Sequence, residues 1–126
     1  MYGLEFLSTV QVRFVIIAAF FGIVFDLVTG VANAAMHHEL SSEKMRIGLW
    51  HKCGFTACII LGIYLEWVQQ IVDLSSYTGF ELPTTIAVCV FIILIEARSN
   101  YENIRKMSPE ITKGPLEVLH QEDNDK

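Results

Sequence analysis

The sequence lacks the features that mark several common classes of protein. It has only nine lysines and arginines against 14 aspartates and glutamates, for a net charge of −5. A strongly basic face of the kind that binds nucleic acid is therefore absent. The three cysteines, Cys53, Cys58 and Cys89, show no CxxC or Cys/His spacing typical of zinc sites. We expect them to be buried thiols, because free cysteine behaves as a small hydrophobic residue.

Catalytic motifs are also missing. The sequence contains no nucleophile paired with a base, no phosphate-binding loop and no paired catalytic carboxylates. His37 and His38 are adjacent, so they do not share a helix face, and no carboxylate stands at ligand spacing from them. We therefore expect neither an enzyme nor a bound metal or cofactor.

What the sequence does contain is apolar material. Hydrophobic residues make up 52% of the 126 residues and the mean hydropathy is +0.43, more than one soluble domain of this size needs. They fall into three blocks instead of being interleaved with polar residues at helical spacing. This predicts a small all-α integral membrane protein with about three transmembrane helices, near residues 14–36, 53–72 and 82–101. A transmembrane domain over residues 1–106 and a charged cytoplasmic tail over 107–126 follow from it.

Each expected span carries polar residues that insertion must tolerate. The aliphatic and aromatic residues of the first span contribute roughly −4 to −7 kcal/mol, which outweighs about +2.5 to +3.5 for Asp26. In the second span, the cost of Glu66, Gln69 and Gln70 nearly cancels the favourable insertion free energy of the apolar residues. Insertion of this span is therefore expected to rely on partner helices. The third apolar run would reach only about 18 Å as a helix. To cross the membrane, this helix must extend into the flanking residues. Pro83 is suited to its first turn.

The distribution of basic residues predicts the orientation. Only Arg13 precedes the first span. Three spans place the other eight on the opposite side: Lys44, Arg46, Lys52, Arg98, Arg105, Lys106, Lys113 and Lys126. The positive-inside rule then predicts an outside N-terminus and a cytoplasmic C-terminus. Lys44, Arg46 and Lys52 would form a basic cytoplasmic loop resting on the anionic leaflet.

A competing interpretation treats residues 1–34 as a signal peptide. Residues 14–25 have the length of a signal-peptide apolar region, and residues 32–34 (ANA) imitate a cleavage site. Against it, Arg13 is offset by Glu5, and an unusually long polar break precedes the site. The mass of the mature protein would distinguish the two interpretations.

At helical spacing, small and polar residues form one stripe on each expected span. The stripes comprise Ala18, Gly22, Asp26, Thr29, Gly30 and Asn33 on the first span; Gly62, Glu66 and Gln70 on the second, continuing a ladder from Gly54 and Cys58; and Glu96, Ser99, Asn100 and Asn103 on the third. These faces either pack the helices into a bundle or face a partner copy or a water-filled lumen. Another possibility for Asp26 is that the first span ends early, but this leaves about 12 apolar residues, too few to cross.

Three segments together resemble a known family. They are Asp26-x-x-Thr29-Gly30, then Ser41-Ser42 with Gly48 and Lys52, then Glu96-x-x-Ser99-x-x-Glu102-Asn103. In this order and at these places beside the apolar blocks, they resemble the bacteriophage holin family, which includes the clostridial toxin-secretion holins. The resemblance covers about residues 22–106. The sequence departs from the family pattern at Asn100-Tyr101 and at His37-His38-Glu39.

The resemblance implies a phage protein that oligomerises with itself in the host bacterial cytoplasmic (inner) membrane. It implies lesions or pores that release or activate an endolysin and lyse the host at a set time, with an antiholin as a possible further partner. A small ion or proton channel or transporter, and an antiholin-like regulatory membrane protein, are the alternatives. Co-expression with an endolysin would separate them, since neither alternative lyses the cell.

Overall fold

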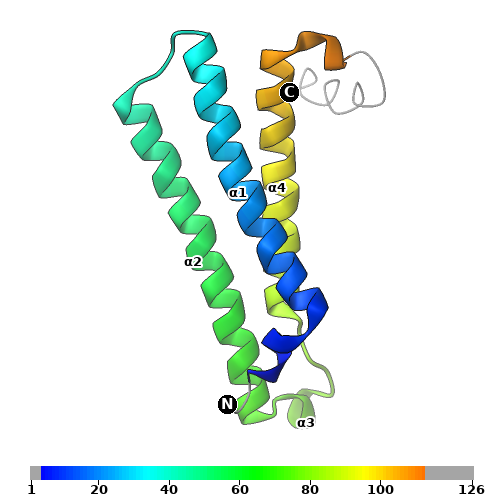
Figure 1. Ribbon diagram of the computed structural model, residues 1–126. Coiled ribbons are helices and arrows are strands. Elements are labelled where there is room, and N and C mark those ends of the chain that lie inside the picture. Colours follow the sequence, from blue (N-terminus) through cyan, green and yellow to red (C-terminus); the bar gives the residue numbers. More distant parts are fainter. Residues whose placement is uncertain (1–3, 113–126) are drawn as a thin grey trace.

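The computed structural model describes residues 4–112, in which helices joined by short turns are the regular structure and no strand is present. Three helices are long: α1 (Val10–Met36), α2 (Ser42–Val72) and α4 (Thr84–Met107). Short elements flank them: η1 (Glu5–Ser8), α3 (Ser75–Thr78) and η2 (Pro109–Thr112). The long helices run up, down and up (Figure 1). All three are long and apolar enough to cross a membrane, which confirms the expected fold class.

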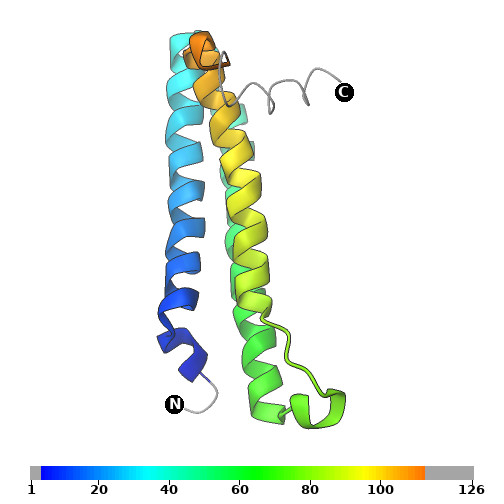
Figure 2. The ribbon, with the colours of Figure 1, turned by 90° about the vertical axis from the view of Figure 1, so that its right-hand side faces the viewer.

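Helix α4 holds the bundle together. It packs along most of α1, as Figure 2 shows from the side, and less extensively against α2. Of the three long helices, α1 and α2 contact each other least. Toward the end that carries the α1–α2 connection, α2 moves away from α4 (Figure 1). The molecule is therefore a close α1–α4 pair with α2 leaning against it.

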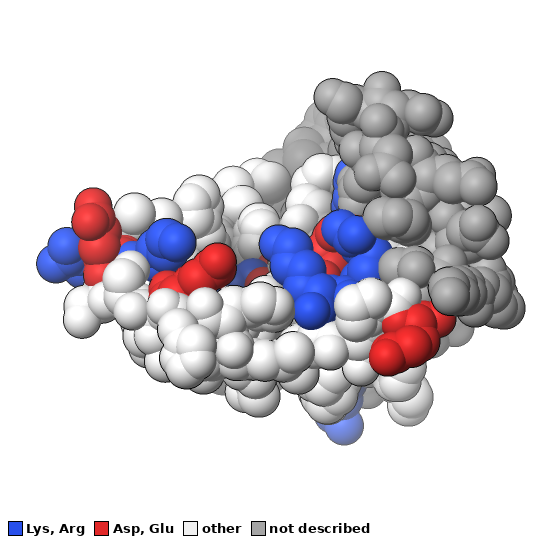
Figure 3. Space-filling model, turned by 90° about the horizontal axis from the view of Figure 1, so that it is seen from above, with Lys and Arg blue, Asp and Glu red and all other residues white. Residues whose placement is uncertain are grey.

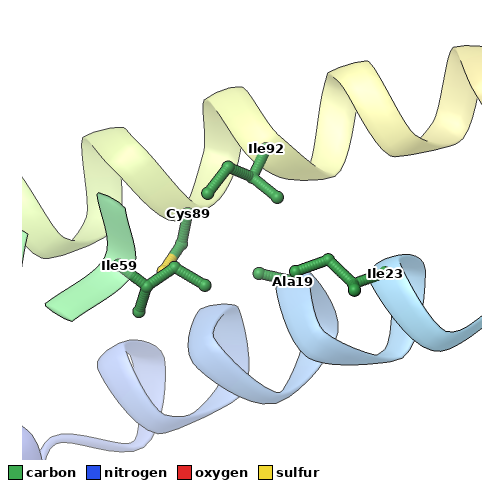
Figure 4. Packing of buried hydrophobic residues seen from close by; sticks show 5 residues of the cluster. All are labelled: Ala19, Ile23, Ile59, Cys89 and Ile92. Carbon is green, nitrogen blue, oxygen red and sulfur yellow. The ribbon is translucent and has the colours of Figure 1, made fainter. Parts of the chain in front are cut away.

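The hydrophobic core is small and lies where all three helices meet. Ala19 and Ile23 of α1, Ile59 of α2, and Cys89 and Ile92 of α4 pack together there (Figure 4). Most large apolar side chains instead point outward. Examples are Phe14, Phe21, Phe91 and Leu94. An apolar exterior around so small a core suits a lipid environment, because lipid solvates these side chains as well as a protein core does.

The second helix differs from the prediction at its start. It begins at Ser42, whose preceding residue Ser41 caps it by accepting a hydrogen bond from Lys44 N at 3.1 Å. The apolar run of this span starts near residue 53, and the sequence alone therefore predicts a later start. A good N-cap and a polar first turn extend the helix beyond the apolar run, so only a short connection joins α1 to α2.

The cysteines also differ from expectation. Cys89 is buried, whereas Cys53 and Cys58 are exposed on α2. On an ideal helix each four-residue step advances about 400°, so a ladder of such steps drifts about 40° per step. Gly54 and Cys58 have drifted out of the face that buries Gly62 and Glu66.

Helix α1 continues without a break through residues 32–34, where the signal-peptide interpretation places a cleavage site. Its inner face packs along α4, so the helix is part of the bundle. Most of the expected cytoplasmic tail, residues 113–126, lies outside the described residues.

Candidate functional site: an ion cluster inside the helical bundle

Asp26 lies on the face of α1 that meets the other two long helices. The inward positions of α1 recur at helical spacing, and Ala19, Ile23, Asp26 and Thr29 are all buried. Their neighbours Val24 and Val28 are exposed on the opposite side. The carboxylate therefore points into the bundle, not toward lipid.

The partner of Asp26 is Lys52. The Nζ atom of Lys52 donates to Asp26 Oδ2. It also donates to both carboxylate oxygens of Glu96, at 2.8 Å in each case. The Glu96 side chain is only 1% exposed. One residue from each long helix thus meets in a single cluster of two carboxylates and one ammonium, called here the ion cluster. It carries one excess negative charge when all three groups are ionised.

Polar residues of α4 extend the cluster toward the α1–α2 connection. Asn103 Nδ2 donates to Asp26 Oδ1 at 3.0 Å and lies 3.0 Å from Thr29 Oγ1. Asn100 Nδ2 donates to the Gly22 carbonyl at 3.3 Å. The Thr29 hydroxyl has one proton for three acceptors: the Phe25 carbonyl at 2.9 Å, the Asp26 carbonyl at 3.3 Å and Asn100 Oδ1 at 3.2 Å. These bonds join α1 and α4 over two turns and satisfy polar groups that lipid would leave unpaired.

Small residues permit the close approach of the helices at these levels. A Cβ atom added at Gly22 would lie 3.2 Å from Glu96 Cβ, and one at Gly62 would lie 3.2 Å from the Thr84 carbonyl. Thr84 Oγ1 also donates to the Gly62 carbonyl at 2.7 Å, which joins α2 to the start of α4. A Cβ at Gly30 would make only ordinary contact with Asn103.

The remaining residues of the three stripes lie apart from the ion cluster. Ser99 and Asn33 are half-buried, and Ser99 lines a pocket between α1 and α2. Glu66 and Gln70 lie together near the other end of the bundle, where they line a second pocket. The three predicted faces are therefore not one continuous polar surface within a single chain, because the small hydrophobic core separates two polar regions.

The first pocket lies beside the ion cluster. It has a volume of about 290 Å³ and is lined by Asp26, Lys52, Ser99 and Asn103, together with residues of the α1–α2 connection. The sparse contact between α1 and α2 leaves this space open. The ion cluster is therefore reached through this pocket, beside the α1–α2 connection.

The three residues assigned to a basic cytoplasmic loop all lie on α2. Lys44 and Arg46 are exposed in its first turns, whereas Lys52 belongs to the ion cluster. Figure 3 looks down on this end and shows side chains of both charges exposed there. The physical reason is again the early start of α2, which turns a stretch read as a loop into a helix with an inner face.

The pairing of Lys52 with Asp26 and Glu96 was not predicted from the sequence, which assigned Lys52 to a basic loop. A signal for Lys52 exists, since Lys52, Ile59 and Glu66 stand seven residues apart and share one helix face. Lys52 also rests 5.5 Å from the ring centroid of Phe55, a further inward residue of α2.

A helical bundle with an apolar exterior, a charged interior and three membrane-length helices defines a multi-pass membrane protein. The sequence matches the bacteriophage holin family over residues 6–121, nearly the whole chain, and the protein belongs to that family. Holins are membrane proteins that time lysis and are not known as enzymes. Comparisons with curated proteins and with solved structures give no match.

Proposed function

We propose that this protein is a holin that oligomerises in the bacterial cytoplasmic membrane and opens lesions through which an endolysin is released or activated, so that the host lyses at a set time. Family membership supports the general function. The observation that carries the mechanism is the ion cluster, which places three ionisable side chains from three spanning helices within a few ångströms of one another.

The ion cluster has two properties that suit a protein with a closed and an open state. Ionisable groups inside a membrane are costly unless they are paired or reach water. In the single chain Lys52 pairs with both carboxylates, which lowers that cost in the closed bundle. In an oligomer the same groups would be equally satisfied by water in a lumen.

The uneven packing suggests which helix moves. Asp26 and Glu96 lie on the closely packed α1–α4 pair, while Lys52 comes from α2, which makes fewer contacts. Withdrawal of α2 would break the ion cluster and uncover the polar faces of α1 and α4. Several copies could then line a lumen with Asp26, Thr29 and Asn103. In this proposal the α1–α4 pairs form the wall of the lumen. Helix α2 is the cover, that is, the helix that shields their polar faces in the closed state.

The experiment is inducible expression in a bacterial host together with a cytoplasmic endolysin, followed by optical density. The proposal expects an abrupt fall in density after a delay, with endolysin activity in the medium. Growth arrest with no release of endolysin would favour an ion channel instead. Delay of lysis caused by a second holin, with no lysis by this protein alone, would favour an antiholin.

A further inference from the structure

The outer surface of α4 changes from apolar to charged at the level of the ion cluster. Up to that level every exposed residue of the helix is apolar: Ala87, Val90, Phe91, Leu94 and Ala97. The next exposed residues of α4 are Arg98 and Lys106. Arg98 stands two residues after Glu96, about 3 Å along the helix. Helix α4 therefore suits contact with lipid hydrocarbon as far as the ion cluster and little beyond it.

Helix α2 shows the same change at the same level. Trp50 is 71% exposed and stands two residues before Lys52. Tryptophan is enriched where hydrocarbon meets lipid headgroups, because its ring is apolar and its N–H is polar. Beyond Trp50, toward the α1–α2 connection, Lys44 and Arg46 are exposed. The outer surfaces of α2 and α4 thus agree on an edge of the hydrocarbon near the ion cluster.

The other edge of the hydrocarbon lies about 20 Å away along the bundle. Arg13 of α1 precedes Asp26 by 13 residues, about 20 Å, and its Nε atom donates to the Leu7 carbonyl at 3.1 Å, toward the N-terminal end. Trp67 of α2 follows Lys52 by 15 residues, about 22 Å. The hydrocarbon core of a bilayer is about 30 Å thick. About 10 Å of it is therefore left on the connection side of the ion cluster.

A position of the ion cluster at the bilayer centre fits these surfaces poorly. The hydrocarbon would then extend about 15 Å, or about ten residues, from the cluster in each direction. It would immerse the exposed Lys44 and Arg98, each at a large insertion cost. It would also leave Phe14 and Leu65, which are 68% and 43% exposed, outside the hydrocarbon at the other end. An off-centre position removes both conflicts, because the long side chain of Arg98 can extend to the headgroups.

The pocket beside the ion cluster faces the nearer edge. Ser41, Lys44 and Gly48 line it on the connection side, and it reaches Lys52, whose side chain is 15% exposed. Its volume of about 290 Å³ has room for several waters, since each water occupies about 30 Å³. The pocket is therefore a path for water from the membrane surface to the ion cluster.

We propose that the ion cluster lies one to two turns inside one edge of the hydrocarbon core, and that the pocket admits water to Lys52 while the bundle is closed. Beyond that edge, the connecting ends of the three long helices stand in the headgroup layer and in water. Hydrocarbon surrounds the stretch from the ion cluster to Trp67. The proposal holds for either orientation in the membrane and does not rest on the proposed function, since it concerns the closed chain.

The depth of Trp50 tests the position of the ion cluster. The full-length protein is placed in phospholipid vesicles whose lipids carry bromine, a quencher of tryptophan fluorescence, either near the headgroup or near the end of the acyl chain. The variant Trp67→Phe keeps Trp50 as the only tryptophan. The reference is Ile60→Trp with both native tryptophans replaced by phenylalanine. Ile60 is 62% exposed and lies eight residues past Lys52, about 12 Å along α2.

We expect bromine near the headgroup to quench Trp50 at least twofold more than bromine near the chain end. The tryptophan of Ile60→Trp should show the opposite order, because it lies near the middle of the hydrocarbon. Stronger quenching of Trp50 by the deep bromine, or equal depths for the two tryptophans, would overturn the proposed position.

Cysteine labelling tests the access of water to the pocket. In a variant without the native cysteines, Gly48→Cys lines the pocket, and Gly54→Cys lies six residues further along α2, about 9 Å deeper. An added Cβ meets nothing within 4 Å at either position, so the two variants should fold alike. With a charged maleimide on both faces of the vesicles, we expect Gly48→Cys to react at least tenfold faster. Equal rates would overturn the proposed access. Neither measurement involves lysis, so failure here is distinct from failure of the proposed function.

Discussion

At the scale of single residues, Lys52 links the three helices. It is the only cation of the ion cluster, and both carboxylates depend on it. Removing one member of a buried ion pair typically costs about 3–5 kcal/mol, because the charge left behind has no partner. Replacing all members with neutral residues of similar size is often nearly neutral. The ion cluster should therefore behave as a unit.

Lys52→Met should lower the free energy of unfolding in detergent by about 3 kcal/mol or more and move lysis earlier or prevent accumulation. The check is thermal unfolding by circular dichroism together with lysis timing. Lys44→Met, at an exposed position of the same helix, is the control and should have little effect. The triple variant with Asp26→Asn and Glu96→Gln should regain most of the stability. A triple variant as unstable as Lys52→Met would show that Lys52 matters through packing and not through charge.

Gly22→Val should destabilise the bundle by about 1–3 kcal/mol, because the added side chain would push Glu96 and α4 away from α1. Gly54→Val is a matched control, since a Cβ at Gly54 meets nothing within 4 Å. Both variants replace glycine with valine in a helix, so the change in intrinsic helix preference is the same. The difference between their free energies of unfolding therefore measures the effect on packing. Equal unfolding temperatures for the two variants would contradict the close α1–α4 contact.

At the scale of elements, the length of the apolar blocks and their separation by polar stretches were enough to predict three membrane helices. The helix boundaries and the inward faces of the helices were harder to predict from the sequence. The stretch from Ser42 to Lys52 contains enough charge to read as a loop, yet a serine cap and its connection to an apolar run make it helical. A four-residue ladder wrongly joined Gly54 to Glu66, because three such steps rotate about 120° around the helix. To predict that Lys52 pairs with Asp26 and Glu96, one must know how the three helices pack against one another. Residue spacing along a single helix does not give that information.

The contact between α2 and α4 yields a test of helix docking. Thr84→Val keeps the shape of the side chain and removes the hydrogen bond to the Gly62 carbonyl. Interhelical hydrogen bonds in membranes contribute about 0.6 kcal/mol on average, so we expect a loss of that size and a modestly earlier lysis. Thr78→Val removes an exposed hydroxyl that bonds the nearby backbone of Leu74 and Phe80 and joins no two long helices, so it should leave lysis timing unchanged. A later lysis for Thr84→Val would argue against α2 as the cover.

At the scale of the whole molecule, the two ends of the bundle carry different charges. The connection between α1 and α2 lies at the same end as the last turn of α4, which holds Arg105 and Lys106. The opposite end holds residues 73–83, which contain no lysine or arginine. The positive-inside rule therefore still favours a cytoplasmic location for the first of these ends, even though Lys52 is paired within the ion cluster.

Reporter fusions test this orientation. A fluorescent protein that matures only in the cytoplasm should be bright at the C-terminus. Alkaline phosphatase, active only outside the cytoplasm, should be active when inserted between residues 79 and 81. The reverse pattern would place the ion cluster in the other half of the bilayer and contradict the predicted orientation.

The central claim is that the inner polar face of the α1–α4 pair becomes a water-filled lumen, and cysteine labelling tests it most directly. In a variant without the three native cysteines, Thr29→Cys faces the bundle interior and Val28→Cys, its neighbour, faces outward. Cells are treated with a water-soluble maleimide before and after the onset of lysis. We predict that Thr29→Cys becomes reactive only after onset and that Val28→Cys stays unreactive. Release of endolysin while Thr29→Cys remains unreactive, or labelling of Val28→Cys instead, would contradict the account.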